Sequence, residues 1–300
     1  MRFADYFLRT FASAAVLLAA LILLFPLRAE AFFSYDGLLL GASINGEWVS
    51  DSDLQQDRKY HDFRIWGGEG VQLYSLLKKE GEGVALALPE DHEEDGMPPD
   101  PARFLRVQVS AAKTHSVGCA LLAVSGEKDA LPRAPVALGV KNEAYRNAVR
   151  EYLESCGVQE DHPEITQIFR IDLEGDGVDE VLINAQNLLK PSDPAFSSGK
   201  SLWKTAQSGI IPARKKGAYS VILLRRVVQG KVETIPLAEM FSDSSRSAFT
   251  LFKISQFADL DGDGKLEVIL TSASSGRYAC TVYEPGKATS KRLSNAVELR

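Results

Sequence analysis

The chain has 300 residues, of which 45% are hydrophobic and 25% are charged, and its formal net charge at pH 7 is −6. These fractions are those of an ordinary folded protein, so wholesale disorder is excluded. The acidic balance disfavours a nucleic-acid partner, because phosphate backbones are bound by an excess of Lys and Arg. Three cysteines are too few for a disulfide scaffold. We favour a Cys119–Cys156 pair, with three buried thiols as the alternative.

Residues 1–31 are predicted to be a signal peptide. Arg2 and Arg9 precede an apolar run from Phe11 to Phe25, and small residues before Phe32 form a cleavage site that ends at Ala31. The apolar run is shorter than the roughly 20 residues that a membrane-spanning helix prefers. An uncleaved anchor is the alternative, and only that anchor would attach the protein to a membrane. We therefore expect cleavage after Ala31 and a secreted or periplasmic protein.

Residues 32–140 are predicted to be a β-rich N-terminal region. The acidic, proline-rich stretch Pro89–Pro101 is expected to be a solvated loop or linker, because its like charges are too crowded for a packed element. Short runs with strand character alternate with clusters of Gly, Asp and Pro. These runs are Gly37–Ala42, Gly70–Leu77, Gly83–Leu88, Phe104–Val109 and Cys119–Val124.

Residues 141–160 are predicted to be a connector that contains one amphipathic helix. Asn142 can cap the helix, which runs to about Cys156, and Gly157 can end it. The apolar residues between these ends recur at helical spacing. They are Tyr145, Ala148, Val149, Tyr152 and Leu153. The position between the two halves of the chain indicates a helix that packs on a sheet or joins domains.

An acidic motif occurs twice within residues 161–300. Asp172-Leu-Glu-Gly-Asp-Gly-Val-Asp-Glu180 returns in matching register as Asp259-Leu-Asp-Gly-Asp-Gly-Lys-Leu-Glu267. Carboxylates at positions one, three, five and nine, with glycine at position six, converge if the backbone curls around one point. Such crowded acids favour a hard cation there, and their oxygen ligands suit calcium better than zinc. An Asp- and Gly-rich turn that binds no metal is the alternative.

The surroundings of the motif exclude a helix-loop-helix calcium site. Position twelve, which would need a bidentate glutamate, holds Ile183 in the first copy and Leu270 in the second. The flanks are short and rich in β-formers, so each loop is predicted to join two strands. Over about residues 165–186 and 252–272 the chain resembles the FG-GAP and VCBS repeats, which are calcium-loop modules of integrin α-chain propellers and of secreted bacterial proteins.

This resemblance implies two sets of calcium ligands. Glu174 departs from the usual Asp or Asn at position three, and its longer side chain would crowd an ion in the first loop. The first set consists of Asp172, Glu174, Asp176, Glu180 and the carbonyl of Val178. The second set consists of Asp259, Asp261, Asp263, Glu267 and the carbonyl of Lys265. One or two structural Ca²⁺ ions are therefore implied.

Each motif is followed by sequence that predicts two further strands, which gives two antiparallel, four-stranded, blade-like repeats of propeller type in residues 161–300. Gln229-Gly230 is predicted to be the tight turn of a hairpin in the first repeat. Arg277–Tyr283 and Ala288–Leu293 supply the last strands of the second. The polar insertion Pro191–Gly217, with Trp203 and the basic cluster at residues 214–216, is expected to be a disordered excursion, with a recognition loop as the alternative. The fold class is thus mainly β.

The sequence contains no recognisable catalytic motif. The four histidines are scattered, and the clear pairs of carboxylates belong to the acidic loops. We therefore expect a binding module for a protein or glycan, in which calcium has a structural role. An exported hydrolase, with its active site in the N-terminal half and the repeats as an accessory module, is the alternative, since triads assemble from distant residues. A purely structural envelope protein is a third possibility.

Overall fold

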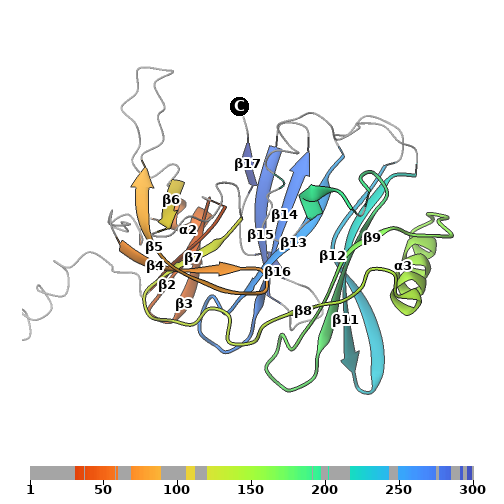
Figure 1. The fold of residues 1–300 in the computed structure, drawn as a ribbon, viewed down its shortest axis with the longest axis horizontal. Coiled ribbons are helices and arrows are strands. Elements are labelled where there is room, and N and C mark those ends of the chain that lie inside the picture. The colour runs from red at the N-terminus through yellow and green to blue at the C-terminus, as the bar shows by residue number, and fades with distance from the viewer. Residues whose placement is uncertain are drawn as a thin grey trace, which may run out of the picture.

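The structure is a computed structural model that describes residues 31–36, 38–57, 59, 69–88, 106–111, 120–190, 192–196, 202, 217–242, 249–274, 277–284, 291–292 and 296–298. Three antiparallel sheets make up most of this part of the chain, which confirms the mainly β fold (Figure 1). No helix in these segments is long and apolar enough to cross a membrane. Four predictions lie outside the described residues: the signal segment before Ala31, the loop Pro89–Pro101, Trp203 and the basic cluster at residues 214–216.

The N-terminal sheet has seven strands in the order β1-β7-β4-β5-β6-β2-β3, and β1 also pairs with β2. The five runs expected as strands overlap β2, β4, β5, β6 and β7, whereas β1, β3 and the short helix α2 were not predicted. The elements are β1 (Ala31–Tyr35), β2 (Leu38–Ile44), β3 (Glu47–Ser50), α2 (Asp51–Gln56), β4 (Glu69–Ser75), β5 (Lys78–Leu88), β6 (Arg106–Ala111) and β7 (Leu122–Ser125).

The helix expected between the two halves is α3 (Glu143–Ser155). The Asn142 side chain caps its first turn by accepting a hydrogen bond from the N–H two residues later. Gly157 follows its end with a φ of 79°, in the left-handed region that favours glycine. Val149 and Leu153 are fully buried among strand residues of the neighbouring sheet, so the helix packs on a sheet.

The first repeat sheet has the order β12-β11-β10-β9-β8. Gln229 and Gly230, between β11 and β12, have φ values of 53° and 77°, the pair of positive values that a two-residue type I′ turn needs. The predicted hairpin is therefore present, and β9 to β12 are four consecutive antiparallel strands. The strands are β8 (Val136–Ala137), β9 (Ile165–Ile171), β10 (Glu180–Gln186), β11 (Tyr219–Val228) and β12 (Lys231–Phe241).

The second repeat sheet has the order β13-β14-β15-β16, and β17 also pairs with β15. Its first three strands repeat the arrangement of β9, β10 and β11. Of the fourth strand, expected over residues 288–293, the structure describes the two residues of β16. The described strands form no closed propeller. The strands are β13 (Leu251–Ala258), β14 (Glu267–Ser274), β15 (Arg277–Glu284), β16 (Lys291–Arg292) and β17 (Ala296–Glu298).

The insertion between β10 and β11 (Pro191–Gly217) reaches the core where it is described. Two of the three residues of the 3₁₀ helix η2 (Pro194–Phe196) are buried, and so is Leu202. The Lys253 ammonium of β13 donates a hydrogen bond to the Ala195 carbonyl at 2.8 Å. The prediction of a disordered excursion is therefore wrong for these residues, because their apolar side chains have a core to pack against.

The cysteines do not pair as predicted. Cys156 is a free, exposed thiol at the end of α3, and Cys280 is buried on β15. The expected Cys119–Cys156 disulfide is not formed, since Cys156 is a free thiol. Cys119 lies outside the described residues.

One hydrophobic core joins the three sheets. It contains Phe33 of the N-terminal sheet, Phe169 of the first repeat sheet and Phe257 of the second. The rings of Phe169 and Phe257 meet edge to face, with centroids 6.0 Å apart. In Figure 1 the N-terminal sheet lies on the left, the second repeat sheet in the centre, and the first repeat sheet with α3 on the right. The second repeat sheet is thus packed between the other two.

Candidate metal site

Each acidic motif forms a loop between two antiparallel strands of one sheet. The first loop (Asp172–Asp179) leads from β9 to β10, and the second loop (Asp259–Leu266) leads from β13 to β14. The last acid of each motif, Glu180 or Glu267, is the first residue of the second strand. This strand-loop-strand setting agrees with the sequence prediction and excludes a helix-loop-helix site.

Glycines give both loops their curl. Gly175 and Gly177 in the first loop have φ values of 73° and 84°, and Gly262 and Gly264 in the second have values of 88° and 85°. Residues with a Cβ are strained in this left-handed region, so the alternation of acids with glycines is what lets the backbone turn twice within a few residues. The two loops therefore have the same backbone conformation at these glycines.

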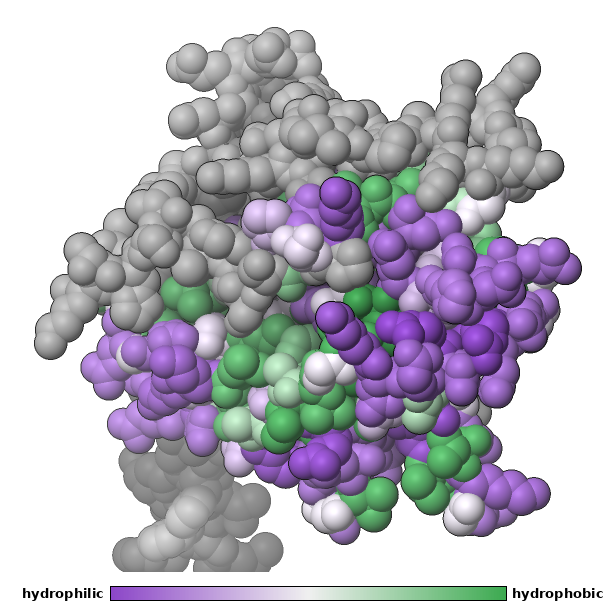
Figure 2. All heavy atoms as spheres, turned by 45° about the vertical axis from the view of Figure 1, so that its right-hand side comes forward, coloured by the Kyte–Doolittle hydropathy of each residue, from purple (hydrophilic) through white to green (hydrophobic). Residues whose placement is uncertain are grey.

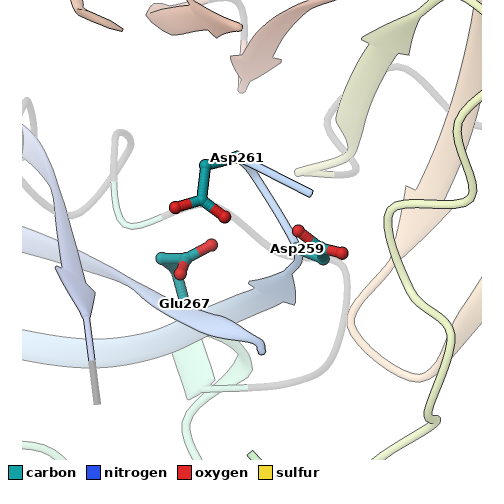
Figure 3. Close-up of side chains that lie close together, drawn as sticks. All are labelled: Asp259, Asp261 and Glu267. Carbon is teal, nitrogen blue, oxygen red and sulfur yellow. The ribbon is translucent and has the colours of Figure 1, made fainter. Parts of the chain in front are cut away.

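Three carboxylates converge in the second loop (Figure 3). One oxygen atom each of Asp259, Asp261 and Glu267 lies within 4.8 Å of the other two. Asp261 and Glu267 face each other, with Asp259 beside them. Asp259 and Glu267 are buried and Asp261 is half-buried. We call these three residues the carboxylate triad.

Backbone N–H groups of the second loop fix all three members of the triad, and Asp261 Oδ1 accepts one hydrogen bond, from the Asp263 N–H at 3.0 Å. Glu267 Oε2 accepts a hydrogen bond from the Leu260 N–H at 2.8 Å. Asp259 accepts one from Gly262 at 2.6 Å with Oδ1 and one from Gly264 at 3.2 Å with Oδ2. These bonds orient the acids in the absence of a ligand. Each bond uses only part of the lone-pair capacity of a carboxylate, so lone pairs remain to bind a cation.

The first loop repeats the backbone bonds without forming a triad. Glu180 Oε2 accepts from the Leu173 N–H at 2.8 Å, and Asp172 accepts from Gly175 at 2.7 Å and from Gly177 at 3.0 Å. The structure describes this loop in full, and its acids do not come as close to one another as those of the triad. The two loops therefore differ in their side chains, although their backbones match.

One side chain, that of Glu174, explains why the first loop lacks a triad. Glu174 lies 4.0 Å from the Arg226 guanidinium, so a cation of the protein already faces its carboxylate. Asp176 makes no difference between the loops, because its Oδ1 accepts a hydrogen bond from the Val178 N–H at 2.8 Å just as Asp263, at the same position of the second loop, accepts one from the Lys265 N–H. The extra methylene that distinguishes Glu174 from Asp261 lets its carboxylate reach outward to that arginine.

Asp263 and Lys265 lie outside the triad. The Lys265 ammonium is 3.5 Å from Asp263 Oδ2, and the backbone N–H of Lys265 donates a hydrogen bond to Asp263 Oδ1 at 2.7 Å. The structure thus brings together three of the predicted ligands: Asp259, Asp261 and Glu267. The other predicted acidic ligands lie outside that group: Asp172, Glu174, Asp176, Glu180 and Asp263. The carbonyls of Val178 and Lys265 stay predicted ligands.

The triad is electrostatically costly. Burial raises the pKa of Glu267 to about 8; the Leu260 N–H opposes this shift, and the carboxylates of Asp261, Asp259 and Asp263 add to it. Burial likewise raises the pKa of Glu180 in the first loop. A cation held among the triad oxygens would remove this repulsion and keep Glu267 ionised.

The two loops contact each other and share one arginine. The Leu266 N–H of the second loop donates to the Leu173 carbonyl of the first at 2.8 Å. Arg133 lies between the loops, where Nε donates to the Asp172 carbonyl and Nη2 donates to the Gly264 carbonyl, both at 2.7 Å. Because the guanidinium carries several donors in a fixed plane, one side chain can hold two loops together.

Arg133 belongs to the segment that connects β7 to β8, residues 126–135, which we call the strap. The Asp259 N–H donates to the Ala130 carbonyl of the strap at 2.9 Å. The Lys128 ammonium of the strap lies 3.5 Å from Asp259 Oδ1. The sequence analysis missed both basic residues of the strap, because Arg133 and Gly264 are 131 positions apart and no local pattern joins them.

The donor set fits a hard divalent cation. All three triad ligands are carboxylate oxygens, which Ca²⁺ and Mg²⁺ prefer, and no His or Cys of the described residues joins them, as a zinc site would require. Comparison of the chain with protein-family models, with curated proteins and with solved structures finds no match.

Proposed function

We propose that this is a calcium-binding β protein in which one ion, held by Asp259, Asp261 and Glu267, braces the β13–β14 hairpin. The observation that carries the proposal is the convergence of three preoriented carboxylates in one β-hairpin loop. Calcium is favoured over magnesium because it tolerates irregular oxygen geometry and accepts backbone carbonyls and water as further ligands.

The chain's own residues define what the ion does. Asp259 follows the last residue of β13, Asp261 lies in the loop, and Glu267 begins β14. A cation held by all three would tie the end of one strand to the start of the next. Its binding energy would add to the stability of the folded state, because the unfolded chain does not hold the three acids together.

The same proposal includes a blade-like organisation of the repeat sheets. Consecutive antiparallel strands with the acidic loop between the first two support it, as does the resemblance of the loops to FG-GAP and VCBS repeats. Calcium would then have a structural role in both the loop and the packing of the sheets. The second loop is the principal site, since the acids of the first do not converge.

We further propose an exported protein that binds a protein or glycan through the surface of its sheets. Figure 2 shows hydrophobic residues gathered near the middle of one face with hydrophilic residues around them, a distribution that supports a contact surface. The insertion Pro191–Gly217 is a weaker candidate for that surface, because Ala195, Phe196 and Leu202 within it are buried in the core. No acid, His or Cys cluster of the described residues other than the triad supports a hydrolase.

Thermal unfolding of the purified protein with calcium and with a chelator tests this function. Calcium at a hundredfold excess over its Kd should stabilise the wild type by about 2.7 kcal/mol. Asp261→Asn should lose most of that gain, because it removes one charged ligand and keeps the size of the side chain. The matched control is Glu174→Gln, at the equivalent position of the first loop, which should keep the gain. A wild type that melts at the same temperature with and without calcium contradicts the proposal.

A further inference from the structure

Contacts of its backbone and of its ammonium group hold Lys128 next to the triad. The buried hydroxyl of Tyr74 accepts a hydrogen bond from the Ala130 N–H at 3.3 Å and lies 3.5 Å from the Lys128 carbonyl. The ammonium lies 3.5 Å from Asp259 Oδ1 and 6.0 Å from the centre of the Phe33 ring. Its backbone and its charge are therefore both fixed next to the second loop.

The second loop leaves room for this lysine at Gly262. A Cβ at that position would lie 2.9 Å from the Lys128 ammonium nitrogen, a distance that real side chains do not reach without a shift. Gly262 is required by its φ of 88°, and the lysine, whose flexible end could shift, occupies the space beside it. The Lys128 side chain is 26% exposed and that of Asp259 is 9% exposed, so their attraction is only partly screened by water.

We propose that Lys128 is a built-in counterion of the second loop, which calcium must displace from Asp259 and which therefore sets the calcium affinity. This inference rests on the proposed function. Without metal, the ammonium reduces the repulsion among the three acids and stabilises the loop. With calcium, two cations compete for Asp259, and the lysine must swing toward solvent. The site would therefore bind calcium more weakly than its three carboxylates alone would allow.

Lys128→Met tests the inference, because methionine keeps the apolar stem and removes the charge. Calorimetric titration of the purified protein with calcium should show an affinity about tenfold higher than that of the wild type, as for loss of a partly exposed charge pair. In chelator, the same variant should melt below the wild type. A purely structural role for Lys128 would not produce these opposite changes in metal-free stability and in affinity.

Two variants serve as controls. Lys128→Arg keeps the charge and should keep the affinity within about twofold. Lys141→Met makes the same change in net charge at an exposed position before α3, and it should leave affinity and melting temperature as in the wild type. If Lys128→Met does not fold, Lys128→Gln makes the same test.

The outcomes separate this inference from the function on which it rests. Equal calcium affinities for the wild type and Lys128→Met would overturn the counterion role and leave the metal site standing. Calcium binding by neither protein would overturn both. A higher melting temperature of Lys128→Met in chelator would also contradict the inference, since the ammonium would then not stabilise the metal-free loop.

Discussion

Glu267 connects metal binding to pH at the level of one side chain. Its pKa in the folded, metal-free protein is about 8, against 4.5 for the unconstrained group, and burial is the main cause. The folded state therefore holds more protons than the unfolded state between about pH 5 and 8. Since stability falls with rising pH wherever the folded state binds the extra proton, this group makes the metal-free protein less stable as the pH rises through that window.

Glu267→Gln should remove this dependence, because the amide oxygen can still accept from the Leu260 N–H but does not ionise. In chelator, the wild type should lose about 3–4 kcal/mol more unfolding free energy between pH 5 and 8 than the variant. Urea denaturation at three pH values measures the difference. With calcium the wild type should gain stability over the same window, because the ion binds the ionised form. Parallel pH profiles for the two proteins in chelator would refute the assignment.

At the scale of the elements, Arg133 joins two hairpins that no backbone ladder connects. Its guanidinium donates to three carbonyls of the two loops, those of Asp172, Leu173 and Gly264. Arg133→Met should lower the free energy of unfolding by about 1–3 kcal/mol, because it removes these three hydrogen bonds, two of which are partly buried. Arg133→Lys should not restore the loss, since one ammonium cannot match the planar fork between two loops. Chemical denaturation measures both effects.

The control for this prediction is Arg170→Met. Arg170 pairs with Asp179 at 3.1 Å, but both side chains are about half exposed, so the pair contributes little. Equal decreases in the free energy of unfolding for Arg133→Met and Arg170→Met would mean that Arg133 stabilises the protein no more than an exposed ion pair does.

The elements that could be predicted from the sequence are those with local signals. The Asn142 cap, the Gln229-Gly230 turn and the alternation of acids with glycines each specify a backbone conformation within a few residues. The conformation of the side chains in the two loops could not be predicted in this way. Glu174 and Asp261 occupy equivalent positions, but Glu174 faces Arg226 of another strand.

Three elements were missed or mistaken for the same physical reason. β1 was not predicted, although Phe33 at its centre is fully buried. The insertion Pro191–Gly217 was interpreted from its polar composition, although Leu202 within it is buried. The strap has no regular structure to predict. Each depends on contacts with residues far away in the chain, which a local pattern does not encode.

At the scale of the whole molecule, polar side chains join the two repeat sheets along the free edge of β13. Gln167 of β9 accepts a hydrogen bond from the Ile254 N–H and donates one to the Ile254 carbonyl, both at 3.0 Å. Asn184 of β10 donates to the Phe252 carbonyl at 2.9 Å. All of these groups lie in or next to the core. Side-chain amides of the first repeat sheet therefore satisfy backbone hydrogen-bonding groups on the edge strand β13 of the second repeat sheet.

This junction should make the two repeat sheets unfold together. Gln167→Leu removes both bonds to Ile254 and leaves a buried N–H and a buried carbonyl without partners, at a cost of about 2–4 kcal/mol. The wild type should show one transition, and chelation should shift all of it. In Gln167→Leu the second repeat sheet should unfold separately, so that calcium stabilises only part of the structure. Hydrogen exchange of β9–β12 and β13–β15, measured with and without calcium, resolves the two sheets.

Thr166→Val is the matched control for this coupling. Thr166 is buried next to Gln167, and its hydroxyl donates to the Asn184 carbonyl at 3.1 Å within the first repeat sheet. Loss of this hydroxyl should lower the free energy of unfolding, but the two repeat sheets should still unfold together, because no hydrogen bond to β13 is removed. If Gln167→Leu keeps a single transition in which calcium protects both sheets equally, the amides of β9 are not what couples them. The shared core of Phe169 and Phe257 would then be sufficient, and calcium at one loop would act on the whole molecule through apolar packing alone.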